Sequence, residues 1–177
     1  MNLLTILIVH ALFFRTLDYM LLEEKQQPQP CSSAEAKQFD FGVGDWNLSW
    51  TAQDGKQKTG VNKISQLYGG CVIKEEFADP VGGFAGMSVS TYDVYAKKWK
   101  QTWVDNTGSY LDFVGEYRDG YMVLSRKMQK QGKEFIQRMR WYDIAANSLK
   151  WNWERSDDNG KTWTVIWKIN YTRKEKT

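Results

Sequence analysis

The chain has 177 residues, of which 42% are hydrophobic and 15% are aromatic, with nine Trp and nine Tyr. This composition is typical of a single globular domain and excludes a disordered chain. The formal net charge of +3 is small and spread along the chain, so it does not indicate a nucleic-acid-binding protein.

The only histidine, His10, lies in an apolar N-terminal stretch. A domain that begins after this stretch has no imidazole. This excludes Ser-His-Asp and Cys-His catalysis, a His-ligated haem and a conventional zinc site. We therefore expect no metal and no cofactor.

Residues 1–22 are a predicted signal peptide or apolar leader. The run MNLLTILIVHALFF has the length of a signal-peptide core and is too short to span a bilayer comfortably. It has no basic residue before it and no clear small-x-small cleavage site, so an uncleaved anchor or a mis-assigned start are the alternatives. The expected localisation is secreted or periplasmic, with no membrane contact beyond the leader.

Residues 23–37 are expected to form a linker that is rich in Gln and Pro, with one short helix over 32–39 that Ser33 could cap. The only two cysteines are Cys31 and Cys71. In an exported protein such a pair predicts a disulfide, here between the linker and a strand. The alternative is a buried Cys71 and an exposed thiol at Cys31.

Residues 38–173 alternate repeatedly between apolar and polar side chains, which predicts about ten strands. The expected strands are 45–51, 61–68, 71–77, 87–95, 99–105, 109–117, 121–128, 134–143, 149–155 and 162–172. No stretch of helical period is long enough to cover a sheet. An antiparallel, mostly up-and-down β-barrel is therefore expected, with a two-sheet sandwich as the alternative, and residues 174–177 form a basic tail.

Five segments of this domain occur in a characteristic order. They are QFDFGVGDWNLSW (38–50), GGCVIKEEF (69–77), STYDVYAKKWKQTWVDNTG (90–108), GEYRDGYMVL (115–124) and WNWERSDDNGKTWTVIWKINYTR (151–173). Together they resemble a family of secreted, mostly bacterial lipocalin-like (calycin-type) domains of unknown function. The resemblance implies a barrel but no reaction. Gly42 stands where that family usually has Trp, so either this barrel end is open or a neighbouring side chain fills the slot.

Several polar side chains share strand faces with apolar ones and are candidates for a site inside the barrel. Glu75 alternates with Ile73 and Phe77, and Asp105 alternates with Trp103. The predicted ligand-binding residues are Glu75, Trp99, Gln101, Trp103, Asp105, Arg138, Arg140, Trp151 and Trp153. Buried charges need partners, so Glu75 and Asp105 are expected to pair with Arg138 or Arg140. A shift of one residue in register would instead turn these charges to water.

The function that this pattern favours is non-enzymatic binding of a small, partly apolar molecule among Trp and Tyr side chains. The alternative is a cofactor-free acid/base enzyme, an isomerase, cyclase or hydrolase that uses Glu75 and Asp105. A fully packed barrel with no cavity is a third reading. The oligomeric state and the identity of the ligand are not indicated.

The segment SDDNGKTW (156–163) resembles the Asp-box of sialidases. It occurs once, in a chain too short for a propeller of four-stranded blades, which favours a structural turn over a glycosidase. Ser156, Asp158 and Gly160 are expected to shape the hairpin between the last two strands. Trp163 is expected to enter the core, on the same face as Trp167.

Overall fold

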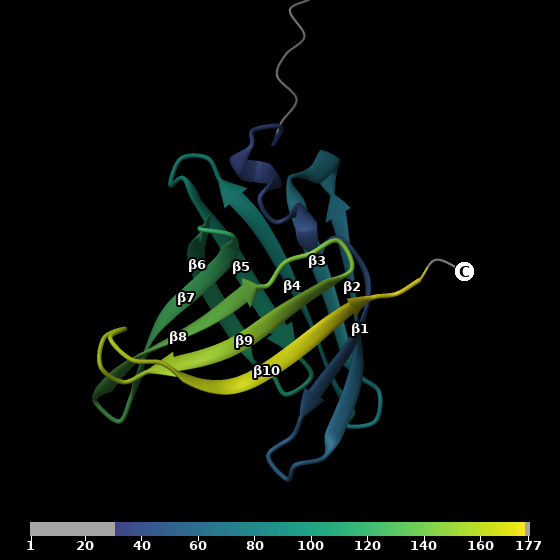
Figure 1. Ribbon diagram of the computed structural model, residues 1–177. Helices are drawn as coiled ribbons and strands as arrows, with labels where there is room; N and C mark the ends of the chain where they lie inside the picture. The colour runs from purple at the N-terminus through teal and green to yellow at the C-terminus, as the bar shows by residue number, and fades with distance from the viewer. Residues whose placement is uncertain (1–30, 176–177) are drawn as a thin grey trace, which may run out of the picture.

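The computed structural model describes residues 31–175, so the predicted leader, the linker before Cys31 and residues 176–177 lie outside the described part of the chain. Residues 31–175 form a closed barrel of ten antiparallel strands, in which each strand pairs with the next and β10 pairs with β1 (Figure 1). The predicted up-and-down barrel is confirmed, and the sandwich is excluded. The strands are β1 (Gly44–Thr51), β2 (Gln57–Leu67), β3 (Val72–Asp79), β4 (Phe84–Asp93), β5 (Lys98–Asp105), β6 (Tyr110–Arg118), β7 (Tyr121–Lys130), β8 (Lys133–Tyr142), β9 (Ser148–Ser156) and β10 (Thr164–Arg173).

Alternation along each strand divides the side chains between the barrel interior and the surface. In β1 the side chains of Trp46, Leu48 and Trp50 are buried, as their shared face predicts. β2 begins four residues before its predicted start, because Gln57 pairs with Thr51 of β1. β4 begins three residues before its predicted start, because Phe84 pairs with Asp79 of β3.

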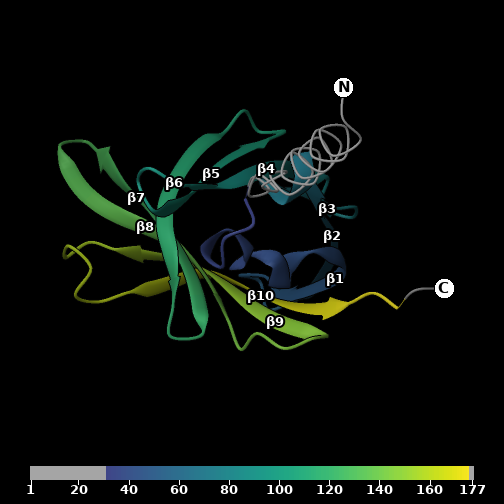
Figure 2. The same ribbon diagram turned by 90° about the horizontal axis from the view of Figure 1, so that it is seen from above.

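Short turns at the N-terminus close one end of the barrel. The 3-10 helices η1 (Glu35–Lys37) and η2 (Asp40–Gly42) replace the single expected helix, and Figure 2, which looks onto this end, shows them within the ring of strands. Phe39, between them, packs edge-on against Trp99 and Trp141, with ring centroids 5.4 and 5.0 Å away. A third turn, η3 (Tyr68–Gly70), links β2 to β3.

The contact between Trp46 and Arg173 holds these turns in place. The Trp46 indole N–H donates to the Gly42 carbonyl at 2.7 Å. The Arg173 guanidinium lies 4.1 Å from the centre of the Trp46 ring and donates to the Val43 carbonyl at 2.7 Å. Gly42 is buried, and a Cβ there would make an ordinary van der Waals contact with the Ile64 side chain at 3.6 Å.

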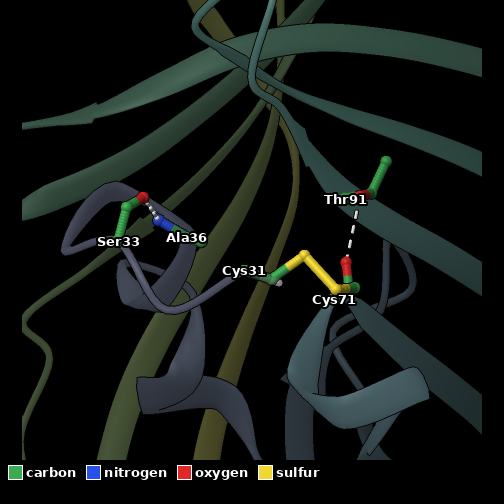
Figure 3. The surroundings of a disulfide bond; sticks show 5 residues. All are labelled: Cys31, Ser33, Ala36, Cys71 and Thr91. Atoms are coloured by element: carbon green, nitrogen blue, oxygen red, sulfur yellow. Dashed lines mark hydrogen bonds between the residues drawn. A yellow bond between two sulfur atoms is a disulfide. The ribbon is translucent and has the colours of Figure 1, made fainter. Parts of the chain in front are cut away.

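The predicted disulfide between Cys31 and Cys71 is confirmed, with the two Cα atoms 5.1 Å apart (Figure 3). It ties the N-terminal segment to the turn before β3, where Thr91 of β4 donates to the Cys71 carbonyl at 2.9 Å. Ser33 Oγ accepts from the Ala36 N–H within the tied segment. A disulfide of this kind fits an oxidising compartment. Within residues 31–175, no helix has the length and hydrophobicity needed to cross a bilayer.

Replacing both cysteines by Ser (Cys31→Ser with Cys71→Ser) should lower the free energy of unfolding by about 2–4 kcal/mol, because the bridge restricts a long loop of the unfolded chain. Urea unfolding followed by Trp fluorescence measures this loss. Reduction of the wild-type protein should lower its free energy of unfolding by the same amount. Reduction of the double variant should cause no further loss. Equal stability of the oxidised wild type and the variant would contradict a stabilising bridge.

Candidate functional site: an aromatic cavity in the barrel

A cavity of about 260 Å³ lies inside the barrel. The position of the cavity along the barrel can be followed on β5. This strand begins near Trp99, which packs against Phe39 of the N-terminal turns, and ends at Asp105, which lines the cavity. Trp99 and Asp105 are about 20 Å apart along the strand, so the cavity reaches towards the end opposite the closed one. The lining residues described by the structure are Glu75, Phe77, Phe84, Trp103, Asp105, Leu111, Met139, Trp141, Trp151, Trp153, Ile166, Trp167, Ile169 and Tyr171.

The walls of this cavity are predominantly aromatic. Five of the described lining residues are Trp, and the Trp151 ring stands at 89° to the Trp167 ring with centroids 5.6 Å apart. Trp153 lies at 42° to Trp151 and packs edge-on against Phe113. Edge-to-face and tilted contacts of this kind are favourable between aromatic rings, and the cavity is the space that these rings border.

Glu75 is the polar group deep in the cavity. Asn62 Nδ2 donates to Glu75 Oε1 at 2.5 Å, and Ser88 Oγ donates to Oε2 at 2.7 Å. The Tyr171 hydroxyl accepts from the same Asn62 amide at 3.3 Å. Within the described residues Glu75 makes no ion pair, so only neutral groups stabilise its charge.

This setting changes the acidity of both Glu75 and Tyr171. Burial raises the pKa of the Glu75 carboxyl, and the hydrogen bonds from Asn62 and Ser88 offset that rise only in part. Burial also raises the pKa of the Tyr171 phenol, and the adjacent Glu75 carboxyl raises it further. Glu75 is therefore a weaker acid than an exposed Glu, and Tyr171 stays protonated at neutral pH.

Asp105, at the rim, is in the opposite situation. Burial acts to raise the pKa of Asp105, but hydrogen bonds from Thr107, Trp103 and Ser109 outweigh it and hold the pKa well below its usual range. The Trp103 indole N–H donates to Oδ2 at 2.8 Å, and the Thr107 hydroxyl donates to Oδ1 at 2.6 Å. Asp105 is thus an ionised carboxylate at neutral pH, and it shapes the turn between β5 and β6.

The structure brings five of the nine predicted site residues together around the cavity. Trp103, Trp151 and Trp153 line the cavity with the two carboxylates. Trp99 and Gln101 also point inward, but they lie closer to the closed end of the barrel than the cavity does. Trp99 packs on Phe39, and Gln101 Nε2 donates to Ser90 Oγ at 2.9 Å. These two residues belong to the core and do not line the cavity.

The prediction that Arg138 and Arg140 enter the barrel is wrong. On β8 the buried inward residues are Phe135, Met139 and Trp141, so the two arginines lie on the outer face. Arg138 Nε donates to Glu154 of β9 at 2.5 Å. Arg140 lies between the rings of Tyr121 and Tyr142, 5.2 and 4.9 Å from their centres. Glu75 and Asp105 therefore have no arginine partner there.

The Asp-box segment forms a hydrogen-bonded turn between β9 and β10. Ser156 Oγ accepts from the Gly160 N–H at 2.8 Å and donates to Asp158 Oδ1 at 2.7 Å. Asp158 also accepts from the Thr162 N–H and hydroxyl, and these hydrogen bonds lower its pKa to about 2. Gly160 has φ +88°, a conformation that favours glycine.

The inward orientation expected for Trp163 is wrong. A β-bulge between Val165 and Trp167 inserts one residue into β10, which reverses the alternation that precedes it. Trp163 consequently lies outside, where the Arg138 guanidinium is 3.6 Å from its ring centre. Trp167, after the bulge, points inward and lines the cavity with Ile166.

Sequence reasoning missed several cavity residues. Phe77 and Trp167 are on strand faces that alternation had identified, and their size was the available signal, whereas Trp141 is on the face of β8 opposite the one predicted to point inward. Glu75 accepts hydrogen bonds from Asn62 of β2 and Ser88 of β4. No local sequence pattern predicts these contacts, because only the register of the closed barrel brings the three residues together.

Comparison with protein-family models and with curated proteins finds no match for this chain. The resemblance to the secreted lipocalin-like family therefore stays a prediction. Among residues 31–175, no group of three or more His, Cys, Asp or Glu side chains is placed to hold a metal ion.

Replacing Glu75 by Gln should change how stability depends on pH. The folded-state pKa of Glu75 lies above the unfolded value, which is close to 4.5, so wild-type stability falls as pH rises from that value to the folded pKa. Glu75→Gln lacks this loss, so it should gain stability relative to wild type by up to about 1.4 kcal/mol per pH unit in this window. Urea unfolding between pH 4 and pH 8 measures the difference.

Asp105→Asn is the matched control, because the folded pKa of Asp105 lies below the unfolded one. The stability that Asp105 contributes is present above about pH 3.8 and is lost only as pH falls through the folded pKa. The stability difference between this variant and wild type should therefore stay constant from pH 5 to pH 8. If the stability difference between Glu75→Gln and wild type were constant from pH 4 to pH 8, the pKa of Glu75 would not be raised in the folded protein.

Proposed function

We propose that the protein binds a small, partly apolar ligand in the barrel cavity and does not transform it. The observation that carries this proposal is the aromatic cavity of about 260 Å³ inside an otherwise packed barrel. Protein interiors are normally close-packed, and apolar pockets with a few polar groups are the usual form of small-molecule sites. The volume is just below the lower end of drug-sized pockets, about 300 Å³, which favours a compact ligand.

The polar groups indicate how such a ligand would be oriented. Its apolar part would contact the indole rings of Trp103, Trp151 and Trp167, and a polar group would reach Glu75. Asn62 and Ser88 hold the Glu75 carboxyl in one orientation, which lowers the entropic cost of binding.

A cofactor-free acid/base enzyme is the second candidate, and the raised pKa of Glu75 is the observation that favours it. A carboxyl whose pKa is raised by burial is a candidate general acid or base. Asp105 is a poor second catalytic carboxylate, since its hydrogen bonds hold its pKa well below the usual range. Turnover of a bound compound that Glu75→Gln abolishes, with binding retained, would favour the enzyme over the binding protein.

We also propose that the protein is exported to an oxidising compartment. The disulfide supports this location, because such bridges persist outside the reducing cytosol. The barrel is compatible with the secreted lipocalin-like family that the sequence resembles. Cell fractionation with a thiol-labelling assay of Cys31 and Cys71 tests the proposal.

Native mass spectrometry of the purified full chain should detect a co-purified small molecule. A second measurement uses 2-naphthol, a compact amphipathic probe, in calorimetric titrations. Ile166→Trp should weaken its binding at least tenfold, because Ile166 lines the cavity.

Val165→Trp is the matched control, since Val165 precedes Ile166 and pairs with Glu154 on the outer face of the barrel. Its affinity for 2-naphthol should stay within twofold of wild type. A ligand-free protein that binds no probe, or equal losses in both variants, would contradict binding in this cavity.

A further inference from the structure

The charged groups of the cavity all have the same sign. Among the described lining residues, Glu75 and Asp105 are the only ionisable groups besides Tyr171, and none is Lys, Arg or His. Hydrogen bonds keep Asp105 ionised at the rim. Glu75, deeper inside, has Asn62 and Ser88 as its hydrogen-bond partners and lacks a positive charge within the described residues.

The arginines near the barrel interior interact with other groups. Arg126 donates to Gln137 at 3.0 Å and lies 5.4 Å from the centre of the Phe113 ring. Arg155 stacks 3.9 Å from the centre of Phe135 and pairs with Asp157. Neither lines the cavity. An anionic ligand would therefore meet two carboxylates without a basic partner.

The aromatic walls favour the opposite charge. The face of an indole ring is electronegative, and Trp is the side chain that attracts cations most strongly by this means. The rings of Trp151 and Trp167 are perpendicular, and Trp153 lies at an intermediate angle to Trp151. A compact group between them contacts several rings at once. Several aromatic rings around one site are a usual means of binding quaternary ammonium groups.

We propose that the ligand of this cavity is a compact organic cation, an amine or a quaternary ammonium compound, held by the Trp rings and by Glu75. This inference rests on the proposed binding function and specifies its ligand class. Asp105 at the rim attracts the cation towards the cavity, and Glu75 is its counter-ion inside. Burial of a carboxyl without a partner raises the pKa of Glu75, and a bound cation supplies the missing partner.

Three probes of nearly equal shape test the ligand class. They are 4-hydroxy-N,N,N-trimethylanilinium as the cation, 4-tert-butylphenol as the neutral analogue and 4-tert-butylbenzoate as the anion. Calorimetric titration of the full chain at pH 7.5 should give a cation affinity at least tenfold above that of the neutral probe, and no binding of the anion at millimolar concentration.

Glu75→Gln should remove most of this preference and bring the cation and the neutral probe within about threefold of each other. Glu76→Gln removes the same charge from the adjacent residue, which is exposed and pairs with Lys74, so it should leave the preference unchanged. Asp105→Asn should reduce the preference to a smaller extent. It provides the comparison if Glu75→Gln does not fold, as judged by its urea unfolding transition.

The possible outcomes separate the two proposals. If the neutral probe or the anion binds as tightly as the cation, the ligand class is wrong and the binding function stands. If none of the three probes binds, both proposals are overturned. Equal effects of Glu75→Gln and Glu76→Gln would remove Glu75 as the counter-ion.

Discussion

The hydrogen-bonded pairing of β1 with β10 is the contact on which the other features of this protein depend. Trp46 lies opposite Arg173, and Ser49 lies opposite Asn170, so the first and last strands close the sheet into a ring. Without a helical layer, an open sheet would expose one apolar face and two unpaired edges. The same pairing brings the Arg173 guanidinium onto Trp46 and the carbonyl of Val43, so closure of the ring also positions the turns that block one end.

The cavity follows from how this ring is filled. Phe39 and the N-terminal turns occupy one end, whereas large indole rings at steep angles line the other and leave space between them. Two carboxylates on that space differ in acidity because their surroundings differ. Glu75 lies inside the barrel with two neutral donors, and Asp105 receives several hydrogen bonds from its own turn and from Trp103. Environment, and not residue type, separates their properties.

The outer face of β8 and β9 has a polar arrangement of its own. Glu154 lies on the outer face of β9, since its strand neighbours Trp153 and Arg155 lie on the inner face, yet its side chain is almost fully buried. Arg138 pairs with Glu154, and Trp163 covers Arg138. This arrangement depends on the bulge in β10, because the inserted residue turns Trp163 outward while Trp167 remains inside. The Asp-box turn thus positions a Trp that protects an ion pair and takes no part in the cavity.

Local sequence was sufficient to predict the strands, their order and the turn at Ser156–Gly160, because alternation and turn chemistry are properties of neighbouring residues. It also predicted the inward faces of β1, β3 and β5, where one face is clearly more apolar. On β8 the prediction took the wrong face, although Phe135, Met139 and Trp141 make the opposite face more apolar than the one with Arg138 and Arg140. Choosing the wrong face turns every side chain of a strand from the interior to the surface.

Only the tertiary structure decided that Trp163 is separated from Trp167 by a bulge, and that Asn62 and Ser88 meet at Glu75. Each of these depends on the register between strands distant in sequence, which closure of the barrel sets and which no local pattern contains. The sequence by itself determined a barrel with acidic and aromatic side chains on its strands. Packing across the interior determined that the acids face a cavity without a basic partner.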